Sequence, residues 1–260
     1  MEQIQSYLKF QIGRRAKDGF SVGYNIIFPF ILVGLLGVLT RNNFGHQITS
    51  QQITSYQYYT VVLITFCASM SIITAAYAAK EEAYEKTAIR IIMAPISEKG
   101  IVFVKIVSCS IVFSICNCFT FILCGLIWKI PLGIEWLAIL LLLIGMSYVV
   151  AGIGILVGTG MKNFLLVKNV INIPITLFAV AGGAFYPFGS LHPVVNGLIN
   201  LSPLTWVNRS IFAVLYDGQF GLILRVIAIH FIVGTVCFLI ANRVFKKEEY
   251  MNGDLPSYKE

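Results

Sequence analysis

The chain has 260 residues, of which 57% are hydrophobic and only 12% are Asp, Glu, Lys or Arg. Soluble domains carry about 25% charged residues, so this composition excludes an ordinary soluble protein, and the polar stretches are too short for a separate enzymatic domain. The net charge of +7 does not indicate binding to nucleic acid, because the basic residues are distributed as in a membrane protein. We therefore predict an all-α integral membrane protein with one transmembrane domain over residues 1–260.

The N-terminal residues 1–18 predict an amphipathic helix that lies on the inner leaflet. Ile4, Tyr7, Leu8 and Ile12 share one helical stripe, and the basic side chains lie elsewhere. Helices with this pattern rest in the membrane interface. The alternative interpretation is a frayed polar tail.

Six segments are long and apolar enough to cross a membrane, which takes roughly 20 residues. They are Phe20–Thr40, Tyr58–Ala79, Ile106–Trp128, Trp136–Met161, Asn169–Tyr186 and Leu222–Asn242. With the N-terminus inside, 15 of the 19 Lys and Arg residues fall on the cytoplasmic side and 4 fall outside. This bias obeys the positive-inside rule, so both termini and the loop between the second and third spans are predicted to be cytoplasmic.

That loop, residues 80–100, reads KEEAYEKTAIRIIMAPISEKG and concentrates charge in an otherwise apolar chain. Read as a helix, it places Tyr84, Thr87, Ala88 and Ile91 on one stripe, with the charged residues around them. Such a helix could rest on the membrane surface and present its charged side to a partner. The alternative is a solvated loop.

The stretch from Asn169 to Asn208 contains no Asp, Glu, Lys or Arg, and its second half is interrupted by Pro and Gly. It is too long for one span. Apolar pieces of 10–14 residues are more often re-entrant than spanning, so we predict short re-entrant helices from the outer face between the fifth and sixth spans.

Two groups of residues within the spans are predicted to serve helix packing rather than catalysis or metal binding. The fourth span carries small residues that allow close helix contact, namely Gly152, Gly154, Gly158 and Gly160. The six cysteines lie within or at the edges of spans, where free Cys behaves as a small apolar residue.

No Asp, Glu, Lys or Arg is predicted deep in any span, and His230 is the one ionisable candidate there. This disfavours ion-coupled transport, and His230 fits a packing role better. An enzyme acting at the outer face through His46, His192 or Asp217 is the weakest alternative. The chain has no Gly-x-x-x-x-Gly-Lys-Ser/Thr motif, so no bound cofactor is predicted, and energy for uphill transport must come from a partner.

Two motifs occur in a set order along the chain. The first is the Glu-rich segment followed by Arg90-Ile-Ile-Met-Ala-Pro95-Ile-Ser97, with Lys105 opening the third span. The second comprises FYPF at 185–188, LHP at 191–193 and LSPLTW at 201–206. Together they resemble the permease subunit of type-2 ABC exporters. The topology fits as well, so the resemblance covers nearly the whole chain.

The resemblance implies a coupling helix over 80–100 that enters a groove on an ABC ATPase, which would bind ATP and Mg²⁺. The implied coupling residues are Glu81, Glu82, Glu85, Arg90, Ala94, Pro95 and Ser97. The implied outer re-entrant region includes Tyr186, Pro187, Pro193, Pro203 and Trp206. Two ATPase copies and a second permease, identical or a sister subunit, would complete the transporter.

From these features we predict an exporter permease in the bacterial cell membrane, surrounded by lipid. The cargo would be a drug, an antimicrobial peptide or a lipid-like molecule, and such cargo would connect the protein to antibiotic resistance. The alternative from another class is a membrane scaffold or immunity protein that binds a partner without transport.

Overall fold

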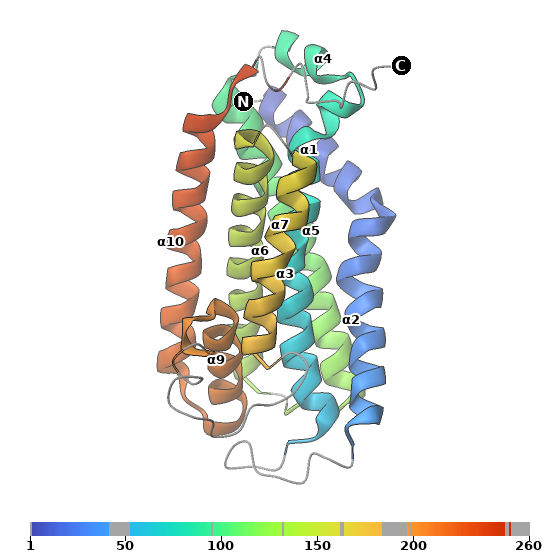
Figure 1. Ribbon diagram of the computed structural model, residues 1–260, viewed down its shortest axis with the longest axis vertical. Helices are drawn as coiled ribbons and strands as arrows, with labels where there is room; N and C mark the ends of the chain where they lie inside the picture. Colours follow the sequence, from blue (N-terminus) through green and yellow to red (C-terminus); the bar gives the residue numbers. More distant parts are fainter. Residues whose placement is uncertain are drawn as a thin grey trace.

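The computed structural model describes residues 2–41, 53–94, 96–131, 133–161, 164–183, 197, 199–247 and 250. Every regular element in this part of the chain is a helix, and the long helices stand side by side in an elongated bundle (Figure 1). The elements are α1 (Glu2–Lys17), α2 (Gly19–Leu39), α3 (Ser55–Tyr84), α4 (Ala88–Met93), α5 (Glu98–Ile127), α6 (Glu135–Gly160), α7 (Phe164–Ala181), α9 (Pro203–Asp217) and α10 (Phe220–Val244).

Among the described residues, five helices are long and apolar enough to cross a membrane, namely α2, α3, α5, α6 and α10. The prediction of an all-α membrane protein is confirmed, and each of these helices coincides with a predicted span. The remaining predicted span, Asn169–Tyr186, corresponds to α7, which begins earlier, at Phe164, and ends at Ala181. The side chains described for α7 form the shorter apolar segment Asn169–Ala181, and Tyr186 lies outside the described residues.

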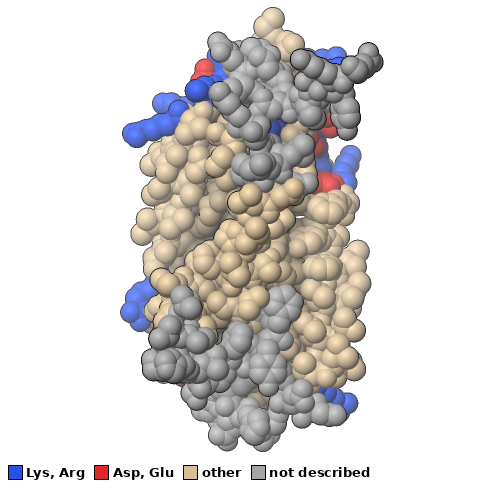
Figure 2. Space-filling view, viewed as in Figure 1, with Lys and Arg blue, Asp and Glu red and all other residues tan. Residues whose placement is uncertain are grey.

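The two ends of the bundle differ in charge. One end carries α1 and α4 (top in Figure 1), and we call it the charged end. Charged side chains gather there, while the visible middle of the bundle presents a band without charge (Figure 2). The opposite end carries α9 (Figure 1). This distribution matches a membrane protein whose apolar band lies in the bilayer.

The helices α3 and α5 extend further into the charged end than their apolar runs predict. Both have 30 residues, which corresponds to about 45 Å at 1.5 Å per residue. The hydrocarbon core is about 30 Å thick. The predicted spans ended at Ala79 and began at Ile106, whereas the helices end at Tyr84 and begin at Glu98. Charged residues in these additional turns are therefore part of the packed bundle.

Side-chain caps fix where several helices begin. Asp18 caps α2 by accepting from the first backbone N–H groups. Thr54 and Gln57 form a reciprocal capping box at the start of α3. Ser97 and Ser202 cap α5 and α9 through their hydroxyl groups. Each cap satisfies backbone donors that have no partner within the helix.

The helix α3 forms the centre of the bundle. It contacts α2, α5, α6, α7 and α9, and 83% of its most apolar window is buried, compared with 22% for α2 and 28% for α10. A helix that is apolar all round is typical of a buried position, either in a core or in a membrane. The outer helices α2 and α10 accordingly present apolar faces to the bilayer.

The glycines of α6 allow its close approach to α3, as the sequence predicted. A Cβ atom on Gly154 would lie 2.5 Å from the Ile72 carbonyl oxygen, and one on Gly158 would lie 2.5 Å from that of Ala76. Gly152 faces α10 instead, where a Cβ would lie 3.1 Å from the Cβ of Cys237. The small-residue stripe is therefore a packing surface on two sides of α6.

We expect Gly154→Ala and Gly158→Ala each to destabilise the bundle by about 1–3 kcal/mol, because the added methyl group meets backbone. Gly34 in α2 is the matched control, since a Cβ there meets nothing within 4 Å. Gly34→Ala should be neutral or stabilise slightly, as Ala usually does in a helix. Unfolding in mixed micelles with increasing dodecyl sulfate measures all three, and equal midpoints would contradict the packing role.

Candidate functional site at the charged end

The stretch 80–100 is divided into three pieces, so the prediction of a single helix is wrong. Its first residues complete α3, which ends in a Schellman motif: Thr87 N donates to Glu82 O at 2.8 Å and Lys86 N donates to Ala83 O at 3.2 Å. Lys86 adopts the left-handed conformation that this motif requires, with φ of 56°. The six-residue helix α4 follows, and Ser97 then caps α5.

A buried ion pair joins α3 to α5 below this turn. The Glu82 side chain is fully buried and pairs with Lys105, which is 2% exposed. Lys105 Nζ also donates to the carbonyl oxygens of Ala78 at 2.7 Å and Ala79 at 3.1 Å. An ammonium group has three donors, and all three therefore have acceptors on α3.

The second oxygen of the Glu82 carboxylate connects this pair to the N-terminal helix. Gln11 Nε2 donates to Glu82 Oε1 at 2.6 Å and also to the Tyr7 hydroxyl at 2.9 Å. Arg14 Nη1 lies 3.7 Å from the same carboxylate oxygen. The buried side of α1, which includes Tyr7 and Gln11, therefore packs on protein. Burial, and then the nearby charge of Glu82, raise the pKa of Tyr7 well above its ordinary value.

Further ion pairs between α1 and α3 surround the buried one. Arg14 pairs with Glu81, with Nε 2.9 Å from Oε1, and also with Glu85. Arg15, which is buried, pairs with the other oxygen of Glu81. We call the following residues the charge network: Gln11, Arg14, Arg15, Glu81, Glu82, Glu85 and Lys105.

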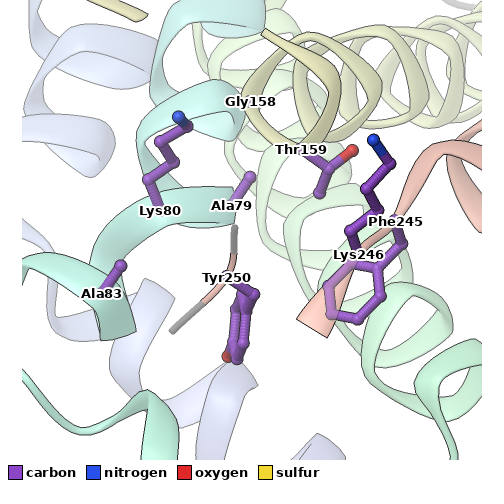
Figure 3. A pocket seen from close by; sticks show the side chains of 8 residues that line it. All are labelled: Ala79, Lys80, Ala83, Gly158, Thr159, Phe245, Lys246 and Tyr250. Carbon is purple, nitrogen blue, oxygen red and sulfur yellow. The ribbon is translucent and has the colours of Figure 1, made fainter. Parts of the chain in front are cut away.

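The chain after α10 returns over the same end. The Tyr250 ring is buried and lies over the Lys105 ammonium group, 5.3 Å from ring centroid to Nζ. Phe245 and Tyr250 line a cavity of about 20 Å³ with Ala79 of α3 and Gly158 of α6 (Figure 3). This volume holds about one water molecule, so the cavity is too small for a cargo.

The charge network sets the position of α1 on the bundle. Removing one partner of a buried ion pair typically costs about 3–5 kcal/mol, because the other charge stays buried without a partner. The network therefore fixes α1 against α3 and α5. It places three of the predicted coupling residues, Glu81, Glu82 and Glu85, in contacts within the chain.

The expectation that the charged side of this stretch faces a partner needs correction at Glu82, which has no exposed surface. The exposed side of α4 instead carries Ile89, 59% exposed, and Met93, 82% exposed, with the exposed Arg90 between them. Ala88 is fully buried and anchors α4 to the bundle. The helix lies at the tip of the charged end (Figure 1), and its two large apolar side chains are exposed there.

Two other predicted coupling residues, Ala94 and Ser97, lie at the end of α4 and at the start of α5. Ala94 ends α4 in an extended conformation with ψ of 146°, as expected for a residue that precedes proline. Ser97 accepts from Gly100 N at 3.1 Å as the cap of α5. Pro95 lies outside the described residues.

The predicted outer region is described only in part. A helix does lie there, α9, but it runs from Pro203 to Asp217, further along the chain than predicted. Pro203 occupies the first turn, where a missing N–H costs nothing, and Trp206 Nε1 donates to Asn200 O at 2.8 Å. Tyr186, Pro187 and Pro193 lie outside the described residues, as do His46 and His192.

Asn208 fixes α9 to the bundle. Its Oδ1 accepts from Thr65 Oγ1 of α3 at 2.7 Å, and its Nδ2 donates to Gly182 O after α7 at 2.9 Å. The side chain is 4% exposed. Asn208 is therefore a packing residue that holds α9 against α3 and the end of α7.

Within the bundle, His230 and the cysteines agree with the packing roles predicted for them. His230 Nδ1 lies 2.7 Å from Val226 O of its own helix. All six cysteines are free, and all except Cys118 are buried. Among the described residues no group of three His, Cys, Asp or Glu side chains could hold a metal ion.

A sequence model of a known family matches residues 2–216, and its description is ABC-2 type transporter. This match covers well over half of the 260 residues. The chain belongs to the ABC-2 type transporter family. A search among curated proteins gave no match. Members of this family are membrane subunits that work with an ABC ATPase, which agrees with the predicted permease.

The buried pair of Glu82 and Lys105 was only weakly indicated before the structure. Glu82 follows the second apolar run and Lys105 precedes the third, so their opposite charges near the same membrane boundary were the one available signal. The exposure of Ile89 and Met93 had no signal in the sequence, because neither residue belongs to the predicted apolar stripe of Tyr84, Thr87, Ala88 and Ile91.

We expect Lys105→Met to lower the free energy of unfolding by about 3–5 kcal/mol, because it leaves the Glu82 carboxylate buried without its partner. The double variant Glu82→Gln/Lys105→Met should cost less than the sum of the two single variants. The exposed pair Glu98–Lys247, 3.2 Å apart with both side chains 48% exposed, is the control and should contribute at most about 1 kcal/mol. Additive effects at the buried pair would show that the two charges do not interact.

Proposed function

We propose that this chain is the permease subunit of an ATP-driven exporter and that an ABC ATPase docks on the charged end. The observation that carries the proposal is the exposed apolar surface of α4, formed by Ile89 and Met93 outside the bundle's apolar band. Apolar side chains at the centre of a polar surface are typical of protein interfaces. Membership of the family supports an ATPase as the partner.

We assign the charged end to the cytoplasm and propose that both termini lie there. Fifteen Lys and Arg residues fall on this side in the predicted topology, against four on the other. The membrane would be the bacterial cell membrane. In this orientation α1 lies at the inner membrane surface and α9 at the outer surface.

We propose that α7 makes the sixth crossing. Its 18 residues span about 27 Å, close to the thickness of the hydrocarbon core. Five crossings would place the two ends of the chain on opposite sides. Arg14 in α1 nevertheless pairs with Glu81, and Lys247 after α10 pairs with Glu98 at the start of α5, both at the charged end. An even number of crossings agrees with these contacts.

The charge network suggests how motion of α4 would reach the membrane. The helix α4 is joined to α3 by one tight turn and to α5 through the Ser97 cap. Glu82 and Lys105 join α3 to α5, and Arg14 joins α1 to α3. A displacement of α4 by the ATPase would therefore move three helices as one unit. In this account Arg90, Ala94, Pro95 and Ser97 belong to the coupling segment, and the glutamates transmit its motion.

The finer assignments rest on the resemblance and on composition. We propose one transmembrane domain, a dimer of identical or sister permeases, and two ATPase copies that bind ATP and Mg²⁺. The region with Tyr186, Pro187, Pro193, Pro203 and Trp206 would be re-entrant and cap the outer end of the pathway. The lack of charged residues in the middle of the bundle favours an amphipathic cargo such as a drug, an antimicrobial peptide or a lipid-like molecule.

Labelling of single cysteines tests the six-crossing topology. In a variant whose six native cysteines are replaced by Ala, cysteine would be placed at Lys86, Gln219 or Lys247. In sealed right-side-out vesicles an impermeant maleimide should label only the Gln219 position, and the other two should react after permeabilisation. Labelling of the Lys247 position from outside would indicate five crossings.

Met93→Asp tests the docking surface. We expect this change to weaken ATPase binding at least about thirtyfold, as for an interface hot spot, while the unfolding midpoint stays unchanged because the side chain is exposed. Leu201→Asp is the matched control, since Leu201 is 73% exposed at the opposite end. Co-purification with the ATPase measures both. Equal retention by the two variants would remove α4 as the docking surface.

Stimulation of the ATPase by added cargo in proteoliposomes separates transport from a scaffold. A permease should give a cargo-dependent increase in hydrolysis, whereas a scaffold that binds without transport should give none.

A further inference from the structure

We propose that the groove between α1 and α4 binds the headgroup of an anionic phospholipid from the leaflet at the charged end. The groove has a volume of about 790 Å³. Its walls come from α1, from the α1–α2 junction, from the end of α3 and from α4. This assignment depends on the membrane position of the bundle and goes beyond the proposed role in ATP-driven transport.

The acidic side chains that line the groove already have partners. Glu81 pairs with Arg14 and Arg15, and Glu85 pairs with Arg14. Asp18 accepts from the backbone N–H groups of Phe20 and Ser21 as the cap of α2. None of these carboxylates needs a further cation.

Three basic side chains in the groove take no part in these ion pairs. Lys9, Lys17 and Arg90 line the groove and are exposed, and none has an acidic partner within the described residues. The groove therefore offers ammonium and guanidinium donors to an incoming anion. A phosphate group accepts such charge-assisted hydrogen bonds, and a guanidinium group can bind it through two parallel bonds.

The position of Lys17 favours a phospholipid over a soluble anion. Lys17 ends α1, and the membrane-crossing helix α2 begins two residues later at Gly19. A bound phosphate would thus lie at the depth where the chain enters the bilayer. Basic pockets at this depth on the cytoplasmic side typically recognise anionic headgroups.

An aromatic surface on α2 begins at Phe20, two residues after Asp18, which lines the groove. Phe20, Tyr24 and Phe28 stack in sequence, with centroid distances of 6.1 and 5.1 Å. Phe20 is 72% exposed and Phe28 is 40% exposed, so this surface faces outward within the apolar band. A headgroup in the groove would direct its acyl chains along these rings. A phospholipid provides both the anionic and the apolar part that this continuous surface accommodates.

Lipid retention by the full-length chain tests the proposal. The protein would be reconstituted in nanodiscs of equal parts phosphatidylglycerol and phosphatidylcholine, gently extracted, and its bound lipids counted by native mass spectrometry. We expect the wild-type chain to retain phosphatidylglycerol preferentially. Each cation near an anionic surface contributes roughly a fivefold preference, so Lys9→Gln, Lys17→Gln and Arg90→Gln together should lower the preference by about a hundredfold.

The control removes the same number of charges at the opposite end, through Arg41→Gln, Lys129→Gln and Arg225→Gln, and should keep the wild-type preference. All six residues are exposed, so both variants should fold, and equal unfolding midpoints would verify this. Equal retention of phosphatidylglycerol by the two variants would overturn the proposal.

Competition by millimolar inorganic phosphate would show instead that the groove is a site for a free anion. Loss of the bound lipid when the ATPase is added would assign the groove to that partner.

Discussion

The burial of the Glu82–Lys105 ion pair is the constraint on which the charged end of this molecule depends. Two opposite charges at a membrane boundary would ordinarily be solvated by water. Here each charge is satisfied by the other and by neighbouring groups, including two α3 carbonyl oxygens and the Gln11 amide. The long helices α3 and α5 therefore continue past the bilayer as one packed unit.

Other features of this end follow from that pair. The α1 helix docks because Gln11, Arg14 and Arg15 satisfy the remaining carboxylate oxygens of α3. The internal pairing leaves α4 as the exposed tip, with apolar residues outward, and it leaves Lys9, Lys17 and Arg90 available for anions. One network thus separates the surface into a region suited to a protein partner and a region suited to lipid.

Much of the membrane architecture could be predicted from the sequence, because apolar length is a direct physical requirement of the bilayer. The helices α2, α6 and α10 begin and end within two residues of their predicted spans, since no charged network lies at their ends. The stretch 80–100 was predicted less well. Its charges suggested a solvent-facing surface, but pairing across 71 residues, as between Gln11 and Glu82, depends on tertiary contacts that no local pattern contains.

The same reasoning explains the exposed face of α4. The stripe that contains Ala88 and Ile91 was predicted to rest on the membrane surface, whereas Ala88 is buried in the bundle and Ile91 packs on its core. The break at Lys86 could not be predicted, because its left-handed conformation is one that glycine usually supplies. That break separates α4 from α3, and it leaves Ile89 and Met93 at the tip rather than on a longer membrane-bound helix.

The central claim is that the charge network transmits motion between α4 and the membrane helices. ATP hydrolysis by the complex in proteoliposomes, with the permease carrying Glu82→Gln and Lys105→Met together, tests it most directly. The account predicts that the ATPase still binds, because α4 is unchanged, but that its hydrolysis no longer responds to cargo. A cargo response equal to that of the wild-type complex would contradict the account.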